Sequence, residues 1–468
     1  MTTPSPSDDS RERLSHASPQ AFWLSRGERP EPEPRLTQDT HCDLAVVGGG
    51  YTGLWTALLA KRRDPSQDVL VLEQATCGHA ASGRNGGFCS PSLTHGLANG
   101  IERWPHEIEL LQRLGAENFD AFQRDLDDFQ IDCGFVRSGK VTVAATAWQS
   151  DALPAAVALA QQHGEKARLL NAGQLQEYVD SPLWQSGMFS PDYALLDPAQ
   201  LVWGLRRACL EHGVRIAEHT EVTALDTQNP LRLHTPYGHV TAQRVALATN
   251  VYRPLLRRLS LSILPVYDYA LVTAPLTDDQ LASIGWQGSH GITDAGNQFH
   301  YLRKTDDNRI LWGGYDAIYH YGSSRQEHLT QRPATFAKLA QQFSQTFPQL
   351  GEVPFTHAWG GIIDSSTRFS MFAGTAAHDR VAYALGFTGL GVGATRYGAE
   401  VMLDLLSGER TERLEPAMIR RRPVPFPPEP VRYLGVQATR ASLAREDSHG
   451  RRNLWLRTLD RLGLGFDS

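Results

Sequence analysis

Three glycines at a fixed spacing are the first residues in this sequence that suggest a chemistry. Gly48-x-Gly50-x-x-Gly53 follows the apolar run that begins at Cys42 and opens a stretch able to form a helix, and Glu73 ends the next apolar run. Gly48 permits a tight turn, Gly50 lets a pyrophosphate approach the backbone, and Gly53 lets the helix pack on the strand. Glu73 would accept hydrogen bonds from ribose hydroxyls. The motif predicts a dinucleotide site but does not distinguish NAD from FAD.

Two further glycine-rich segments bear on this choice. Residues 82–87, SGRNGG, come just after the second apolar run, and their flexible backbone, cation and amide could meet phosphate and the edges of a flavin ring. A later turn, residues 386–393, precedes a helix whose N–H groups and positive dipole end would face a developing anion. The pattern Gly389-x-Gly391-x-x-Ala394 also fits a dinucleotide fingerprint, so an NAD(P) site is the alternative there, although no strand ending in an acid follows it.

Together these segments resemble the D-amino-acid-oxidase-like family of FAD-dependent amine oxidoreductases, especially its bacterial γ-glutamylputrescine-oxidase-like branch. The matching pieces are Glu73 and the segments VVGGGYTGLWTALLA, ASGRNGGF, LDPAQLVWGL, VALATNVY, AWGG and GFTGLGVGA. They run from about residue 40 to about residue 410, and their order makes the resemblance specific. The resemblance implies an α/β fold (α+β overall), in which a Rossmann-like FAD-binding domain is interleaved with a substrate domain built on a mixed β-sheet.

The resemblance also implies which residues contact FAD. The first glycine turn and Glu73 would hold the ADP half, residues 82–87 and the later glycine turn would lie along the flavin, and Val222 matches the place where the family's backbone meets adenine. The implied FAD-binding residues are Gly48, Gly50, Tyr51, Thr52, Gly53, Glu73, Ser82, Arg84, Asn85, Gly86, Gly87, Val222, Thr249, Gly386, Gly389, Gly391 and Val392. Some relatives attach flavin covalently, either through a histidine near His79 or through a late cysteine. Because Cys209 is the last cysteine here, the late-cysteine linkage is unavailable, and we expect non-covalent FAD.

Candidate substrate-binding residues fall in a β-rich region. Strand alternation puts Tyr301 and Arg303 on one face of one strand, and Tyr267 and Tyr269 on one face of another. Aromatic walls with one arginine would suit an amine that bears a carboxylate, because a guanidinium group binds carboxylates through two parallel hydrogen bonds. A solvated arginine beside core aromatics is the alternative interpretation. Similar candidates follow a later strand: Trp359, Asp364 and Arg368.

The resemblance implies a reaction as well. The amine would bind in its neutral form over the flavin and lose a hydride from its α-carbon to the flavin N5, and the imine would hydrolyse to a carbonyl compound and an amine or ammonia. The cofactor carries this chemistry while the protein orients the substrate, so no catalytic acid or base is assigned. Reoxidation would use O2, giving H2O2, or another electron acceptor. An NAD(P)H-linked flavin oxidoreductase and a non-catalytic FAD-binding subunit are the alternative functions.

Length and composition exclude other classes of protein. A chain of 468 residues is long enough for two large domains or about three smaller ones. Its formal charge of 45 − 51 = −6 argues against a nucleic-acid partner. Five cysteines without a CxxC pair predict neither a disulfide framework nor a metal site. No run approaches the roughly 18 apolar residues of a membrane span, and residues 1–40 lack a secretory signal, so we expect no integral membrane segment and a cytoplasmic enzyme.

The chain is expected to divide into four parts along its length. Apolar spacing predicts a helix around Phe119–Phe129, Asp197-Pro198 is expected to open another helix, and residues 305–308 are expected to form a hairpin turn. The last part is expected to wrap the surface with solvated arginines. The expected parts are an N-terminal arm (1–40), the FAD-binding domain (41–100, 197–260 and 355–410), the substrate-binding domain (101–196 and 261–354) and an Arg/Pro-rich C-terminal extension (411–468).

Overall fold

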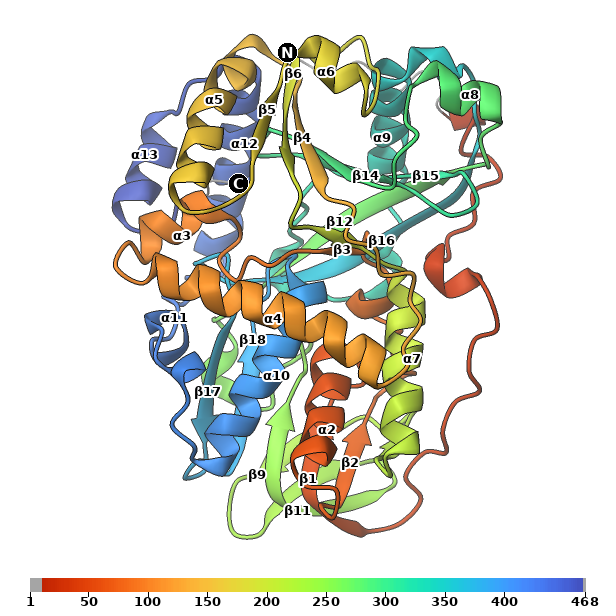
Figure 1. Cartoon of the computed structure of the whole chain (residues 1–468). Coiled ribbons are helices and arrows are strands. Elements are labelled where there is room, and N and C mark those ends of the chain that lie inside the picture. The colour runs from red at the N-terminus through yellow and green to blue at the C-terminus, as the bar shows by residue number, and fades with distance from the viewer. Residues whose placement is uncertain (1–10, 466–468) are drawn as a thin grey trace.

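The structure is a computed structural model that describes residues 11–465, and it consists of two halves, each built on a mixed β-sheet (Figure 1). The first sheet has the strand order β17-β18-β11-β1-β2-β8, and β10 and β9 extend it beside β11. β1 pairs in parallel with both β2 and β11, β2 with β8, and β11 with β18, which is the Rossmann-like core expected from the sequence. The strands are β1 (Thr40–Val47), β2 (Val69–Leu72), β8 (Arg215–Ala217), β9 (Ala224–Asp226), β10 (Leu231–Thr235), β11 (Gly238–Leu247), β17 (Phe372–Ala376) and β18 (Val381–Leu385).

The central strand of this sheet is buried on both faces. Leu44 and Val46 of β1 pack into the cluster beneath the helices, and Ala45 and Val47 pack into the cluster on the other face. A strand covered on both sides is apolar at almost every position, which explains the continuous apolar run in the sequence. The helices that cover one face are α2 (Tyr51–Arg63), α4 (Ile108–Asp128), α7 (Pro198–Glu211) and α10 (Gly391–Ser407) (Figure 1).

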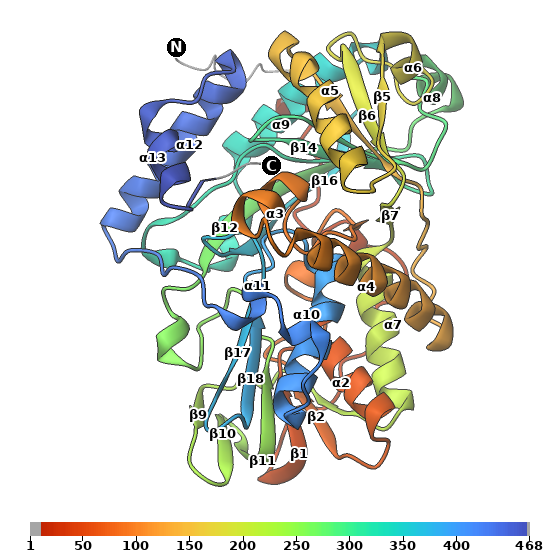
Figure 2. The same cartoon turned by 60° about the vertical axis from the view of Figure 1, so that its left-hand side comes forward.

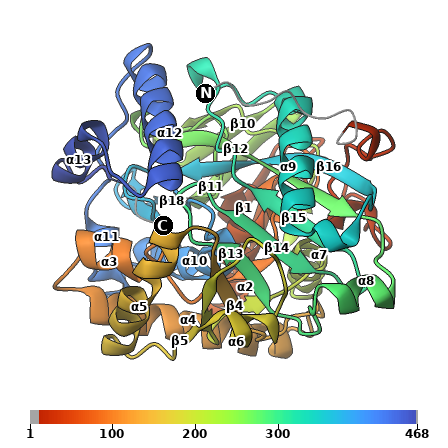
Figure 3. The ribbon, with the colours of Figure 1, turned by 90° about the horizontal axis from the view of Figure 1, so that it is seen from above.

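The second sheet forms the other half, with the strand order β16-β12-β15-β14-β13-β4-β6-β5. α9 (Pro333–Thr346) packs on one face of it through a separate hydrophobic cluster. A view from above shows α9, α12 (Val431–His449) and α5 (Ala147–Gln162) around its strands (Figure 3). The strands are β4 (Lys140–Ala144), β5 (Arg168–Leu170), β6 (Ser186–Ser190), β12 (Leu264–Thr273), β13 (Gly291–Asp294), β14 (His300–Lys304), β15 (Ile310–Gly314) and β16 (Phe355–Ser365). The remaining elements are β3 (Phe88–Cys89), β7 (Ala194–Leu195), α3 (Leu97–Arg103), α5 (Ala147–Gln162), α6 (Ala172–Gln176), α8 (Asp278–Ser283) and α11 (Ala417–Arg420).

Several local predictions are confirmed. α7 begins at Pro198, and the Asp197 carboxylate caps it by accepting hydrogen bonds from the N–H groups of Ala199 (2.9 Å) and Gln200 (3.1 Å). β14 and β15 form the expected antiparallel hairpin around residues 305–308. These features depend on neighbouring residues, which is why the sequence reveals them.

The expected domain boundaries need two corrections. β16 was expected in the FAD-binding domain, yet it pairs along its length with β12 of the second sheet. α4 was expected in the substrate-binding domain, yet Phe119 and Phe122 pack in the cluster beneath the first sheet, beside α2 and α10. Both errors arise because the chain passes between the two halves through segments whose composition does not differ from that of their surroundings, so no linker can be recognised in the sequence.

The described part of the N-terminal arm, residues 11–40, packs on the protein through a few buried side chains. It runs in extended form along one side of both halves (Figure 1), and Phe22 and Trp23 are buried. The Trp23 indole N–H donates to the carbonyl oxygen of Asn85 at 2.9 Å. The arm therefore supports the segment 82–87 from outside.

The C-terminal extension departs from the expected surface wrap. It forms α12 (Val431–His449) and α13 (Leu454–Arg461), which stand beside the second sheet (Figure 2). Asp447 anchors α12, because its carboxylate accepts from the N–H groups of Asn297 (2.7 Å) and Gln298 (2.9 Å). Arg432, expected in solvent, is buried.

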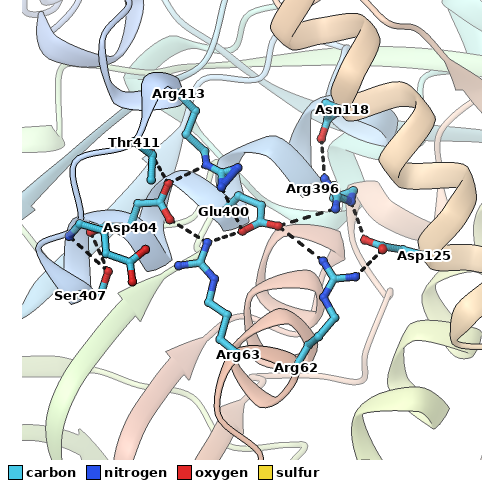
Figure 4. Close-up of polar contacts among 11 residues, drawn as sticks. Arg62, Arg63, Asn118, Asp125, Arg396, Glu400, Asp404, Ser407, Thr411 and Arg413 are labelled. Carbon is cyan, nitrogen blue, oxygen red and sulfur yellow. Dashed lines mark hydrogen bonds and ion pairs between the residues drawn. The ribbon is translucent and has the colours of Figure 1, made fainter.

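An ion-pair network joins α2, α4 and α10 (Figure 4). Asp125 of α4 pairs with Arg62 (2.5 Å) and with Arg396 (2.6 Å), and the buried Asp404 of α10 pairs with Arg63 (2.7 Å). The other members are Glu400, Arg413, Asn118 and Thr411. The network fixes the two helices that follow the glycine turns against each other.

Candidate active site

The first glycine turn, between β1 and α2, has the backbone that its sequence predicts. Gly48 has a φ of +113°, and a Cβ there would lie 2.5 Å from the carbonyl oxygen of Ala248. A Cβ at Gly53 would lie 1.9 Å from the carbonyl oxygen of Gly48. Both positions therefore require glycine. Gly50, the residue before α2, has no side chain to cap the helix, which leaves the helix N-terminus available to an anionic group.

Glu73 lies directly after β2 and is bonded to the same turn. Its carboxylate accepts hydrogen bonds from the N–H groups of Gly49 (2.6 Å) and Ala75 (2.8 Å). Burial raises the pKa of this carboxyl group, against the effect of the two backbone donors. Because each carboxylate oxygen accepts more than one hydrogen bond, Glu73 retains acceptor sites for ligand hydroxyls.

Val222 and Thr249 lie at the same end of the first sheet. Thr249 follows Ala248, whose carbonyl oxygen faces Gly48. Val222 lies two residues after Thr220, whose N–H donates to the carbonyl oxygen of Glu73 at 2.7 Å. The fold thus gathers these residues, far apart in the chain, around the first turn.

Residues 82–87 form a loop that its own side chains hold in shape. The Ser82 hydroxyl accepts from the N–H of Tyr51 at the start of α2 (3.0 Å). The Asn85 amide donates to the carbonyl oxygen of Ser82 (2.9 Å) and accepts from the N–H of Gly87 (2.9 Å). The side chain of Asn85 is therefore used within the loop.

The same loop packs against the second sheet. The carbonyl oxygen of Arg84 accepts from the indole N–H of Trp359 on β16 at 3.0 Å, and the Arg84 guanidinium forms an ion pair with Glu327 at 2.6 Å. A Cβ at Gly86 would lie 2.8 Å from the ring of Tyr301 on β14. The loop therefore bridges the two halves of the molecule.

The later glycine turn lies between β18 and α10. The N–H of Gly386 donates to the carboxylate of Asp364 at 2.6 Å, and burial raises the pKa of Asp364 to about 7. Gly389 has a φ of +85°, and a Cβ there would meet no atom within 4 Å. α10 begins at Gly391, with no side-chain cap from Leu390. The turn therefore presents an uncapped helix N-terminus to open space.

That space is a cavity of about 1010 Å³ between the two halves. Cavities that bind one small ligand usually measure about 300–1,000 Å³, so this volume accommodates a flavin ring system together with a substrate. Its wall includes Arg84, Asn85, Gly86, Asp268, Tyr269, Tyr301, Trp359, Gly361, Thr388, Gly389 and Val392. The C-terminal extension completes the wall with Arg432, Arg440, Leu443, Trp455 and Leu459.

Tyr267 and Tyr269 share one face of β12, as alternation predicts, but that face turns toward a short helical segment (Glu327–Thr330) and α9. The Tyr267 hydroxyl donates to the carbonyl oxygen of Ser324 (3.1 Å), and that of Tyr269 donates to Leu329 (2.8 Å). Tyr269 also lines the cavity, whereas Tyr267 does not. Tyr267 is a core residue, which corrects the prediction that it lines the substrate pocket.

Arg303 lies on the same face of β14 as Tyr301, as predicted, but outside the cavity wall. Its guanidinium donates to the carbonyl oxygen of Leu196 and lies 5.0 Å from the ring centroid of Trp23. The prediction that the Arg303 guanidinium group binds a substrate carboxylate is therefore wrong, because that group is already used inside the protein. The burial comes from the N-terminal arm, which strand alternation does not reveal.

Asp268 is a cavity residue that sequence reasoning missed, as are the wall residues of the C-terminal extension. It lies between Tyr267 and Tyr269, so the alternation that turns both tyrosines toward α9 turns Asp268 into the cavity. The available signal was a lone carboxylate in an otherwise apolar and aromatic strand.

Comparison with known proteins agrees with this geometry. Residues 43–405 match the family model described as FAD dependent oxidoreductase. The chain belongs to this family. The γ-glutamylputrescine oxidoreductase of Escherichia coli K12 is 28% identical to this oxidoreductase over 417 residues, which cover 87% of this chain and 93% of that protein. The glycine oxidase of Geobacillus kaustophilus is 24% identical over 327 residues (67% of this chain, 84% of that protein).

The fold of this FAD-dependent oxidoreductase is also that of two solved enzymes. The crystal structure of the Geobacillus kaustophilus glycine oxidase superposes with a TM-score of 0.66 and 21% identity, covering 79% of this chain and 96% of that one. L-proline dehydrogenase from P. horikoshii superposes with a TM-score of 0.65 and 17% identity, covering 82% and 96%.

The residues of this oxidoreductase fit FAD on structural grounds. The first turn is a cradle that a Cβ at Gly48 or Gly53 would fill, Glu73 retains acceptor sites, and the start of α10 faces the cavity uncapped. Within residues 11–465, no group of three or more His, Cys, Asp and Glu side chains is arranged to hold a metal ion. In the same part of the chain, no helix is long and apolar enough to cross a membrane.

Proposed function

We propose that this chain uses non-covalently bound FAD to oxidise a C–N bond of an amine or amino acid. The observation that carries the proposal is the cavity, where the glycine turn before α10 and the loop 82–87 meet the aromatic and acidic wall of the second sheet. The names of the two relatives, γ-glutamylputrescine oxidoreductase and glycine oxidase, support the substrate class. Reoxidation by O2, with release of H2O2, or by another acceptor would complete the turnover.

FAD supplies the acceptor for the hydride that leaves the α-carbon of the amine. The residues of this chain bind and orient. The first turn and Glu73 hold the ADP half, the loop 82–87 and the turn before α10 position the ring system, and Tyr301 and Trp359 wall the substrate space. The extension contributes a further part of the cavity wall. The product of the step is an imine, which water hydrolyses to a carbonyl compound.

The proposed FAD-binding set keeps every residue expected from the sequence. The side chain of Glu73 offers hydrogen-bond acceptors to the cofactor, and the side chains of Ser82 and Asn85 hold the loop in shape. The glycines let the backbone approach the cofactor closely because they have no side chain. The set is Gly48, Gly50, Tyr51, Thr52, Gly53, Glu73, Ser82, Arg84, Asn85, Gly86, Gly87, Val222, Thr249, Gly386, Gly389, Gly391 and Val392.

The non-covalent linkage rests on the positions of His79 and the cysteines, the groups through which the resemblance to the family offers attachment. His79 does not line the cavity. The five cysteines are buried and free, and they too lie outside the cavity wall. FAD released by acid or heat into the supernatant would agree with this linkage, and flavin that stays with the denatured protein would contradict it.

An absorption spectrum of the purified protein, recorded before and after anaerobic addition of amines and amino acids, tests the function. We expect oxidised flavin bands that one class of amine bleaches, and readmission of air then shows whether O2 restores them. Bleaching by NADPH alone would favour the pyridine-nucleotide alternative. Flavin that no donor bleaches would favour a non-catalytic subunit, and a colourless protein that takes up no FAD would exclude the proposal.

Trp359→Phe should weaken FAD binding about fivefold. The substitution keeps an aromatic ring but removes the hydrogen bond to the carbonyl oxygen of Arg84, worth about 1 kcal/mol, so the loop 82–87 loses an anchor. Trp286→Phe is the matched control, because Trp286 is fully buried and its indole N–H has no partner in the described part of the chain. Equal FAD dissociation constants for the two variants, measured by titration of apoprotein, would contradict the role of Trp359.

A further inference from the structure

Asp268 lies in the middle of β12, and its side chain points into the cavity. Its partner on β16 is Gly361, which also lines the cavity. Because paired residues of antiparallel strands project to the same face, the carboxylate lies beside a position without a side chain. A Cβ at Gly361 would meet only the Cβ of Arg84, at 3.6 Å. The space beside the carboxylate is therefore open toward the loop 82–87.

Tyr301 of β14 fixes the carboxylate from the other side. Its hydroxyl donates to Oδ2 of Asp268 at 2.6 Å. To reach β12, the Tyr301 side chain crosses β15 at Gly313, where a Cβ would lie 2.5 Å from the hydroxyl oxygen. The ring also packs edge-on against Phe88, with 6.0 Å between centroids. Two glycines and one tyrosine thus hold a single carboxylate in a defined place.

In the described part of the chain, the carboxylate of Asp268 forms no ion pair, and His300 acts on it only from a distance. Within residues 11–465, no Lys, Arg or His nitrogen lies within 4.0 Å of its carboxylate. Burial raises the pKa of Asp268 to about 6, against the opposing effect of the Tyr301 hydroxyl. The other carboxylates of the cavity wall have a partner or face solvent: Asp294 pairs with His300 (2.6 Å), Glu446 pairs with Arg452 (3.1 Å), and Glu165 is exposed. Asp268 is half-buried at the cavity wall, and a carboxylate held partly out of water without an ion-pair partner is costly to a fold, so a ligand is the expected source of the missing charge.

We propose that Asp268 binds the protonated nitrogen of the substrate through a charge-assisted hydrogen bond, and that Tyr301 holds the carboxylate in position. This inference rests on the proposed function and deepens it, because it names the substrate as an amine that arrives as a cation. The nitrogen completes the ion pair that the protein leaves open, and it passes one proton to the Asp268 carboxylate before the hydride leaves the α-carbon, so that the imine forms from the neutral amine. Asp268 is then the group that selects amines over alcohols and amides of the same shape.

The test uses the FAD-loaded protein and a cation that cannot be oxidised. tert-Butylammonium has no hydrogen on the carbon that bears nitrogen, and tert-butanol is its neutral isostere. Binding of each is followed by the change in the flavin absorption spectrum at constant ionic strength. The wild type should prefer the cation. Asp268→Asn should weaken binding of the cation about tenfold to a hundredfold, the range for a hydrogen bond between charged groups, and leave binding of tert-butanol unchanged.

Two further variants separate this effect from a general disturbance of the cavity. Tyr301→Phe keeps the carboxylate and loses one hydrogen bond, so it should weaken cation binding about fivefold. Glu165→Gln removes an exposed carboxylate of the same wall and should leave cation binding unchanged. FAD content and the far-UV circular dichroism spectrum establish that each variant is folded; if Asp268→Asn fails this check, Tyr301→Phe alone carries the test.

The outcomes distinguish this inference from the proposed function. Equal cation affinity in the wild type and Asp268→Asn, or a wild type without preference for the cation, would overturn the inference even if amines reduce the flavin. Loss of cation binding in Asp268→Asn, in a protein whose flavin no amine reduces, would support the binding site and contradict only the oxidation.

Discussion

Replacing Gly53 with alanine should give a protein that folds but is purified with little or no FAD. The added Cβ would lie 1.9 Å from the backbone oxygen of Gly48, and a backbone atom cannot rotate aside as the end of a side chain can. α2 must therefore move away from β1, and its N-terminus moves with it. Overpacking of this kind costs about 1–3 kcal/mol, so we expect FAD affinity to fall about tenfold to a hundredfold. The ratio of flavin to protein absorbance after gel filtration measures the effect.

Gly173→Ala is the control for this variant. Gly173 also lies inside a helix, but a Cβ there meets only the Asn171 side chain, at 3.5 Å, and the position is outside the cavity wall. The control should keep a full equivalent of FAD, and its helix should gain slightly in stability. A Gly53→Ala protein that also keeps a full equivalent would show that the turn does not hold the cofactor.

Asp364→Asn should change how the stability of the protein depends on pH. In the unfolded chain Asp364 ionises near 3.8, whereas burial raises its pKa in the folded chain to about 7. The folded state therefore keeps a proton that the unfolded state has lost, and stability falls as pH rises from about 4 to about 7. Between pH 5 and pH 7 this amounts to about 2 kcal/mol, because the slope of about 1.4 kcal/mol per pH unit flattens as the folded-state carboxyl group approaches half titration near pH 7. The asparagine variant lacks this titration. As the pH rises from 5 to 7, its free energy of unfolding relative to that of the wild type should therefore increase by about that amount.

Unfolding in urea at several pH values between 5 and 8, for both proteins, measures the difference, in which the other titrating groups cancel. Asp151→Asn, at an exposed position, is the control and should follow the wild type. A constant difference between Asp364→Asn and the wild type across this range would mean that Asp364 does not change its protonation state as the structure implies. The amide oxygen of the substituted side chain can still accept the hydrogen bond from Gly386, so FAD content should change little.

The sequence predicts features that depend on short stretches of chain. The strand, glycine turn and helix from Cys42 to Arg63 form as expected, because the glycine spacing and the continuous apolar run each have one structural solution. Capping of α7 by Asp197 follows the same logic. Alternation in β12 and β14 also holds residue by residue.

What the sequence could not supply is which face of a strand meets which part of the protein. Alternation grouped Tyr267 with Tyr269 correctly, but only the packing of α9 shows that this face is core and that Asp268 takes the cavity side. Arg303 is on the expected face, yet Trp23 of the N-terminal arm covers it. The helices of the C-terminal extension escaped notice because a segment rich in arginine and proline looks solvated until the wall it completes is known.

The ion-pair network of Figure 4 fixes the spacing of the two helix N-termini before the cofactor binds. Arg62 and Arg63 lie at the end of α2, opposite the first glycine turn, and Asp404 lies at the end of α10, opposite the second. Helices are stiff over this length, so pairing their distal ends at 2.7 Å also sets the spacing of their N-termini. The two turns are thus separated by a fixed span before any dinucleotide arrives. The conformational entropy of the two turns is therefore lost when the chain folds. Binding of a dinucleotide of matching length does not have to order them again, so its affinity is not reduced by that cost.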